Sequence, residues 1–141
     1  MSPELLFRAA NLFALVGWAV LIAGVLMQRD WLRDRLAGLY WPVVLSLAYV
    51  IAVAVGLSTN ASGGFSSLPA VRQLFASDWA LLGGWVHYLA FDLFVGTWIA
   101  RETAHTDMSR FWLVPILPLT FLFGPAGFLL FQIVRIAFQR R

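Results

Sequence analysis

The sequence predicts an all-α integral membrane protein: a four-helix bundle whose fourth helix is kinked by proline. Two observations support this class. Of the 141 residues, 61% are hydrophobic and only 12% are charged, whereas a soluble domain carries roughly a quarter charged residues. In addition, four segments reach the length of about 20 apolar residues that a helix needs to cross a bilayer core. Their connections are short and show no second domain, so we interpret residues 1–141 as one transmembrane domain.

The first predicted span covers residues 5–27 and the second covers residues 39–57. Arg8 and Asn11 lie near the start of the first span, where a long arginine side chain can extend to the head groups. The apolar run is too long for a signal peptide, and a polar sequence follows where a cleavage site would be expected. We therefore interpret the first span as a retained helix. The second span carries no ionisable side chain except two tyrosines.

The third predicted span covers residues 79–100 and the fourth covers residues 111–134. Before the third span, residues 68–76 have apolar side chains at helical spacing and an early proline, which predicts a short helix on the membrane surface. The fourth span contains Gly124-Pro125 near its centre. A proline there kinks or breaks a helix and frees a backbone carbonyl one turn earlier. At that depth the freed carbonyl needs a partner from protein or from a cavity.

The charged residues exclude several classes of protein. All ten basic residues are arginines, and they are scattered between apolar runs rather than gathered in a nucleic-acid-binding stripe. With four crossings, five arginines would lie on each side, so the positive-inside rule leaves the orientation open. Cysteine is absent, which excludes disulfides and sulfur-based metal sites. The sequence also lacks a phosphate loop and a nucleophile elbow.

Two ionisable residues, His87 and Asp92, lie near the centre of the third span. A charged group costs about 2.5–3.5 kcal/mol at that depth, so it indicates a partner or a function. At 3.6 residues per turn the two side chains are about 140° apart, which makes a simple His–Asp dyad unfavourable. Tyr88, one turn before Asp92, is the natural neighbour of the carboxylate. The alternative is that both groups only form hydrogen bonds across the bundle; function is favoured for Asp92 and the structural role for His87.

The sequence predicts no metal site and no cofactor. His87 and His105 are the only histidines, and about 18 residues of helix and turn separate them, which is too far for one shared ion. Glu102, His105 and Asp107 are typical of a solvated loop. Because one axial ligand suffices in some haem proteins, haem on His87 stays open as an alternative.

Two stretches carry a resemblance to a known family. One runs Gly84-Trp85-x-His87-Tyr88-x-x-Phe91-Asp92-Leu93-Phe94-x-Gly96-x-Trp98-Ile99, and the other runs Leu119-Thr120-x-x-Phe123-Gly124-Pro125-x-Gly127. Together they resemble the abscisic-acid-deficient-four-like family of small membrane proteins, over essentially the whole chain. Plant members of that family are plastid proteins required to make neoxanthin from violaxanthin. That isomerisation opens a 5,6-epoxide into an allene and an alcohol.

The resemblance implies a ligand class and a set of site residues. The expected ligand is a lipid-soluble polyene, either a carotenoid or a related isoprenoid, and the expected activity is a cofactor-independent isomerase. Asp92 is the candidate base, with Tyr88 or His87 as the acid. The candidate ligand-binding residues are Trp85, Phe91, Gly96, Trp98, Thr120, Gly124 and Pro125.

Two other functions stay open at this point: a non-enzymatic protein that holds pigment or assembles a pathway enzyme, and a transporter that moves a small solute or proton through Asp92. We expect a multi-pass protein of a bacterial inner or photosynthetic membrane, surrounded by lipids and without a nucleic-acid partner. Because a lone four-helix bundle has little internal volume, a homodimer with ligand at its interface is a further alternative.

Overall fold

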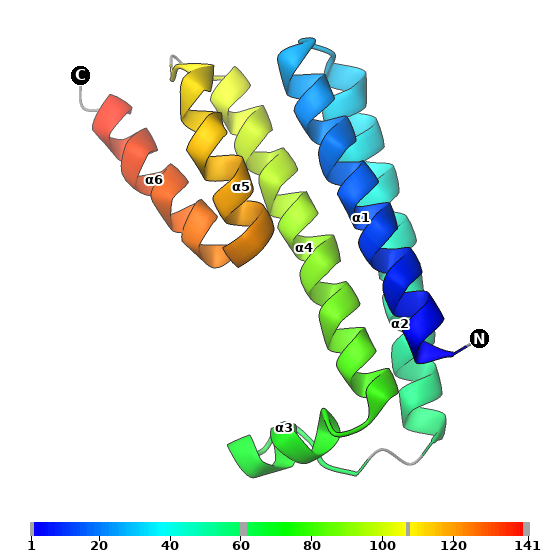
Figure 1. Ribbon diagram of the computed structural model, residues 1–141. Helices are drawn as coiled ribbons and strands as arrows, with labels where there is room; N and C mark the ends of the chain where they lie inside the picture. The colour runs from blue at the N-terminus through cyan, green and yellow to red at the C-terminus, as the bar shows by residue number, and fades with distance from the viewer. Residues whose placement is uncertain (1, 60–61, 107, 140–141) are drawn as a thin grey trace.

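A computed structural model describes residues 2–59, 62–106 and 108–139, and all regular structure in these residues is helical (Figure 1). The α-helices are α1 (Pro3–Leu26), α2 (Trp41–Ser58), α3 (Leu68–Leu74), α4 (Asp78–Ala104), α5 (Leu113–Phe123) and α6 (Pro125–Gln139). A π-helical segment, η1 (Trp31–Tyr40), leads into α2, and a 3-10 turn, η2 (Arg110–Trp112), leads into α5.

Three helical stretches are long and apolar enough to cross a membrane: α1, the continuous Trp31–Ser58 stretch that includes α2, and α4. They correspond to the spans predicted at residues 5–27, 39–57 and 79–100. The short helix α3 lies within the segment expected on the membrane surface. The chain is therefore an all-α membrane protein.

The prediction of one kinked helix over residues 111–134 is wrong. This segment forms two helices, α5 and α6, which fold back on each other as a hairpin beside one half of α4 (Figure 1). At the open end of the hairpin, the rings of Trp112 and Phe138 are 6.2 Å apart. With 11 and 15 residues, the two helices extend about 16 and 22 Å, less than the roughly 30 Å core of a bilayer. The hairpin enters the bundle and returns to the same end.

The reversal at Gly124 has a local cause. Pro125 has no backbone N–H and cannot continue the hydrogen bonding of α5, but it is well suited to the first position of a new helix. Close packing at the tip also needs small residues, because a Cβ at Gly127 would collide with Thr120 of the opposite helix. Pro118, in contrast, lies inside α5 without ending it. Where a kink was predicted, the chain therefore reverses its direction.

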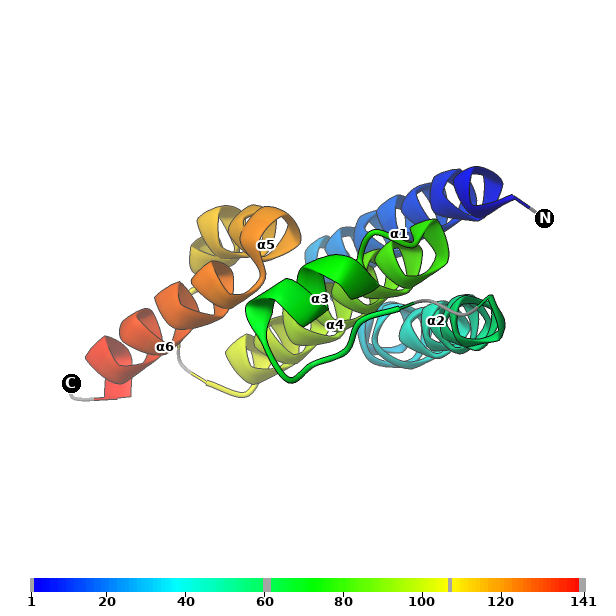
Figure 2. The ribbon, with the colours of Figure 1, turned by 90° about the horizontal axis from the view of Figure 1, so that it is seen from below.

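Helix α4 lies between two groups of helices, with α1 and α2 on one side and α5 and α6 on the other (Figure 2). Two clusters of buried side chains hold these groups together. One joins α1 and α4 to the hairpin and includes Trp18, Leu93 and Phe131. The other joins α1, α2 and α4 and includes Leu45 and Val86. The first half of α4, which is the lower half in Figure 1, therefore packs against α1 and α2, and its Gly84 lies close to the Phe75 ring at the end of α3. The second half of α4 also packs against the hairpin.

Because the hairpin returns, most of the described arginines gather at one end of the bundle, which we call the arginine-rich end. It carries Arg29, Arg33, Arg35, Arg101, Arg110 and Arg135. Arg135 of α6 pairs there with Glu102 of α4 at 3.0 Å. The other end carries Arg8 and Arg72. The equal division of arginines, which assumed four crossings, therefore does not hold for the described residues.

Candidate functional site

The tip of the α5–α6 hairpin meets α4 halfway along its length, at Tyr88. The Tyr88 hydroxyl donates to the backbone carbonyls of Phe121 and Leu122, each at 3.0 Å. Both carbonyls belong to the last turn of α5, where helical partners are lost, and Pro125 has no N–H to offer Phe121. The prediction that Gly124-Pro125 frees a carbonyl in need of a partner is confirmed, and Tyr88 supplies that partner.

Asp92, one turn further along α4, lies against the same tip. Asp92 is only 7% exposed, and a Cβ at Gly124 would collide with the Asp92 Oδ1 atom. Only glycine therefore allows this close approach. The Tyr88 hydroxyl and the Gly124 backbone amide face the carboxylate, but Oδ2 has no hydrogen-bond partner among the described residues. An unpaired buried oxygen costs free energy and marks a position where a ligand or proton can bind.

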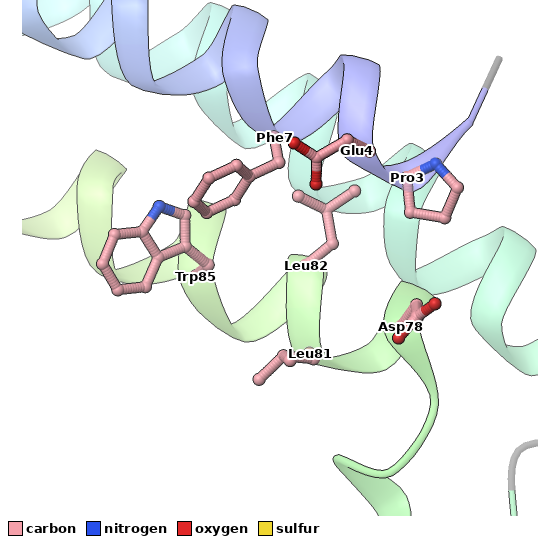
Figure 3. A pocket seen from close by; sticks show the side chains of 7 residues that line it. All are labelled: Pro3, Glu4, Phe7, Asp78, Leu81, Leu82 and Trp85. Atoms are coloured by element: carbon pink, nitrogen blue, oxygen red, sulfur yellow. The ribbon is translucent and has the colours of Figure 1, made fainter.

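Below the tip, the uncovered face of α4 forms a groove with the start of α1 (Figure 3). The groove has a volume of about 400 Å³, with Glu4 and Asp78 among its lining residues. Its aromatic wall is made by Phe7 and Trp85, whose ring centroids are 5.7 Å apart. The Trp85 ring also lies 5.3 Å from that of Tyr88. Trp85 thus connects the groove to the Tyr88–Asp92 pair.

Comparison with known proteins identifies the family. Residues 5–131 match the model of the ABA DEFICIENT 4-like family. The chain belongs to this family. Neither the curated proteins nor the solved structures gave a match. The match extends over the groove residue Phe7, the Tyr88–Asp92 pair and the hairpin tip of this ABA DEFICIENT 4-like protein, whereas the groove residues Pro3 and Glu4 precede it.

His87 and Phe91 lie on another face of α4. Their rings stack with centroids 4.5 Å apart, and His87 faces Tyr49 of α2 at 5.6 Å. Both residues are exposed on the surface of the bundle. The structure therefore brings Tyr88 to Asp92 but does not bring His87 or Phe91 there. This agrees with the angular separation that argued against a His–Asp dyad.

The remaining predicted ligand-binding residues have structural roles, either in the packing of α4 or within the hairpin itself. Gly96 is covered by the ring of Trp18, which leaves no room for a Cβ. Trp98 contacts two phenylalanines of α6 at centroid distances of 5.7 and 5.5 Å. The Thr120 hydroxyl donates to a carbonyl of its own helix at 2.8 Å, and Pro125 begins α6. Of the predicted ligand-binding set, Trp85 lines the groove and Gly124 contacts Asp92.

Sequence reasoning missed the contribution of α1 to this site. Phe7 lines the groove, and the Asn11 side-chain oxygen accepts a hydrogen bond of 3.1 Å from the Trp85 indole N–H. A signal was present, because Asn11 is a polar residue inside an apolar run and follows Phe7 by one helical turn. That spacing places the two side chains on one face of α1.

Proposed function

We propose that this protein takes a carotenoid or related isoprenoid from the bilayer and isomerises it by acid–base chemistry. The observation that carries the proposal is the buried Asp92 carboxylate, whose Oδ2 atom has no partner among the described residues. It lies one helical turn from Tyr88, whose ring neighbours that of Trp85 in the wall of the groove. Family membership supports the ligand class, because plant members act in the conversion of violaxanthin to neoxanthin.

The groove offers a path for a long polyene. From Asp78 at the start of α4 to Asp92 at the tip, the helix rises about 21 Å. Along this path the ligand would contact Phe7 and Trp85, whose flat rings suit a conjugated chain. Asp78 lies at the opposite end of the groove from Trp85, and Glu4 lies between Phe7 and Pro3 (Figure 3). An isoprenoid in this position would place one end group beside Asp92.

The proposed reaction moves two protons and no net electrons. The Asp92 carboxylate removes a proton from the polyene carbon next to the epoxide, and the released electron pair forms the second double bond of the allene. The epoxide C–O bond breaks, and its oxygen takes a proton from the Tyr88 hydroxyl to become an alcohol. Asp92 and Tyr88 are one helical turn apart, so the proton can return from Asp92 to Tyr88 after each cycle.

The test is the conversion of a violaxanthin-type 5,6-epoxide by protein reconstituted in lipid vesicles, with chromatography of the extracted pigments. We expect Asp92→Asn to abolish product formation, because an amide of the same shape cannot accept the proton. The matched control is His87→Asn, which also changes an ionisable residue of α4 but on the other face, and we expect it to keep activity. Product formation by Asp92→Asn at the rate of the parent protein would contradict the assignment.

A structural function for the Tyr88–Asp92 pair is the second candidate, and one observation favours it. Tyr88 already bonds two carbonyls of the hairpin tip, so the pair can act as a clamp in a protein that holds pigment without converting it. In that case Asp92→Asn should lower the thermal unfolding midpoint while bound polyene is released unchanged. Loss of turnover with an unchanged unfolding midpoint supports the isomerase instead.

A further inference from the structure

Two adjoining cavities at the arginine-rich end form one site with an apolar part and a polar part. The apolar part is a groove of about 580 Å³ between the last turns of α1 and the first half of α5. The polar part is a pocket of about 550 Å³ among the connections at that end. The two parts share Val25, Ser109, Arg110 and Leu113. They share no lining residue with the groove below the hairpin tip.

The apolar groove is suited to a hydrocarbon chain. Ile22 and Leu26 line its α1 side, and Val114 and Leu117 line its α5 side. Val114 is 69% exposed, so the groove opens sideways, toward the lipid that surrounds a membrane protein. A chain lying in it would run parallel to the helices and reach Arg110 at its upper end.

Arg110 is the cation that this site can offer to a ligand. Arg33 also lines the polar pocket, but it is 7% exposed and already pairs with Asp30 and Asp34 at 2.9 and 2.7 Å. In residues 2–59, 62–106 and 108–139, no carboxylate lies within ion-pair distance of Arg110. Its partner is the Gln28 amide, whose oxygen, when turned toward the guanidinium, accepts from Nη2 at 2.9 Å. An amide carries no negative charge, so no side chain in the described part of the chain neutralises Arg110.

We infer that this composite site binds an anionic phospholipid, with an acyl chain in the α1–α5 groove and the phosphate at Arg110. Arginine forms strong charge-assisted hydrogen bonds with phosphate oxygens, and basic pockets between transmembrane helices bind anionic head groups. The Ser109 hydroxyl, which lines both parts of the site, adds a second donor for the phosphate. The bound lipid fills the seam between α1 and the hairpin.

The head-group assignment is tested by native mass spectrometry of the protein in mild detergent with phosphatidylglycerol or phosphatidylcholine of the same acyl chains. We expect the protein to retain phosphatidylglycerol. Arg110→Gln should lower the affinity for this lipid about tenfold, because a hydrogen bond to a charged group contributes binding free energy of that order. Arg72→Gln is the matched control, because Arg72 is exposed at the opposite end. Equal retention of the two lipids, or equal affinity of the two variants, would overturn the proposal.

The tail assignment has a separate test, which also keeps the proposal falsifiable if Arg110→Gln fails to fold. Val114→Trp fills the groove, whereas Val43→Trp adds the same bulk to an exposed position of α2. We expect only Val114→Trp to reduce phosphatidylglycerol retention. A third measurement adds inorganic phosphate at the same concentration as phosphatidylglycerol, and we expect the phosphate not to displace the lipid. Displacement by phosphate, or unchanged retention with Val114→Trp, would show that the groove holds no chain.

Discussion

Helix α4 and the α5–α6 hairpin satisfy their backbone hydrogen-bonding groups inside the bilayer in different ways. Over its 27 residues α4 satisfies its backbone groups within the helix, whereas the hairpin ends a helix in the middle of the bundle and leaves carbonyls without helical partners. Inside a bilayer such carbonyls need a protein partner, and Tyr88 of α4 provides it. The comparison teaches that a chain reversal at this depth depends on polar groups from a neighbouring continuous helix.

The reversal also divides α4 into two halves with different surroundings. The upper half is covered by α5 and α6, and the lower half is left beside α1 with an open groove (Figure 1). Tyr88 and Asp92 lie at the boundary between these halves. Tyr88 is therefore placed to hold the hairpin tip, and Asp92 lies where we propose that the ligand binds.

The largest expected effect concerns the side on which α6 ends. Because the chain lacks cysteine, single cysteines can be labelled with an impermeant reagent in intact cells. We expect Gln139→Cys to react from the same side as Arg29→Cys and from the opposite side to Ser66→Cys, in an all-or-none pattern. From the positive-inside rule we expect the arginine-rich end to be the cytoplasmic one. Reaction of Gln139→Cys from the side of Ser66→Cys would mean that α5 and α6 cross the membrane as one helix.

The next prediction compares the substitution of glycine by alanine at the hairpin tip and in a continuous helix. Gly124→Ala places a Cβ against Asp92 Oδ1 and should lower the free energy of unfolding by about 2 kcal/mol, as overpacking does. Gly56→Ala in α2 meets its neighbours at an ordinary 3.5 Å and gains helix propensity. We expect the second variant to be at least as stable as the parent. Detergent-induced unfolding followed by circular dichroism measures both; equal stability of the variants would contradict the close contact at the tip.

The smallest of the three effects removes one hydroxyl. Tyr88→Phe leaves the carbonyls of Phe121 and Leu122 without their donor and should cost about 1–3 kcal/mol of unfolding free energy. Tyr49 of α2 is also half-buried, and its hydroxyl makes no hydrogen bond with the described residues. Tyr49→Phe should therefore change stability by less than about 0.5 kcal/mol. If both variants unfolded alike in the same titration, Tyr88 would not be the partner of the tip.

The sequence predicts the continuous helices well but not the hairpin. Hydropathy and length identify α1, α2 and α4, because each is an apolar run that satisfies its own backbone. The position of the break at Gly124-Pro125 is also readable from the sequence. The angle between the two helices that flank this break cannot be read from the sequence. A proline-containing run of 24 mainly apolar residues can cross the membrane as one bent helix or return as two short helices. The outcome depends on whether a neighbour offers a donor at the tip.

The same limit applies to the candidate site. The helical stripe that joins Trp85, Tyr88 and Asp92 follows from spacing alone, and the structure places all three on the side of α4 that faces the groove and the tip. The packing of Gly96 against Trp18, and of Trp98 against α6, could not be predicted from spacing. The first contact depends on how closely α1 approaches α4, and the second depends on which face of α4 the returning hairpin covers.

The half-depth hairpin makes the protein asymmetric across the membrane, because the two leaflets surround different numbers of helices. In the described part of the chain, α1, α2 and α4 occupy both leaflets, whereas α5 and α6 lie beside one half of α4 only (Figure 1). Each helix with its side chains is about 10 Å wide. Five helices therefore displace lipid from the leaflet at the arginine-rich end, whereas three spanning helices and the short α3 lie at the other end. The molecule is a wedge, and it fits best in a bilayer that bulges toward its arginine-rich end.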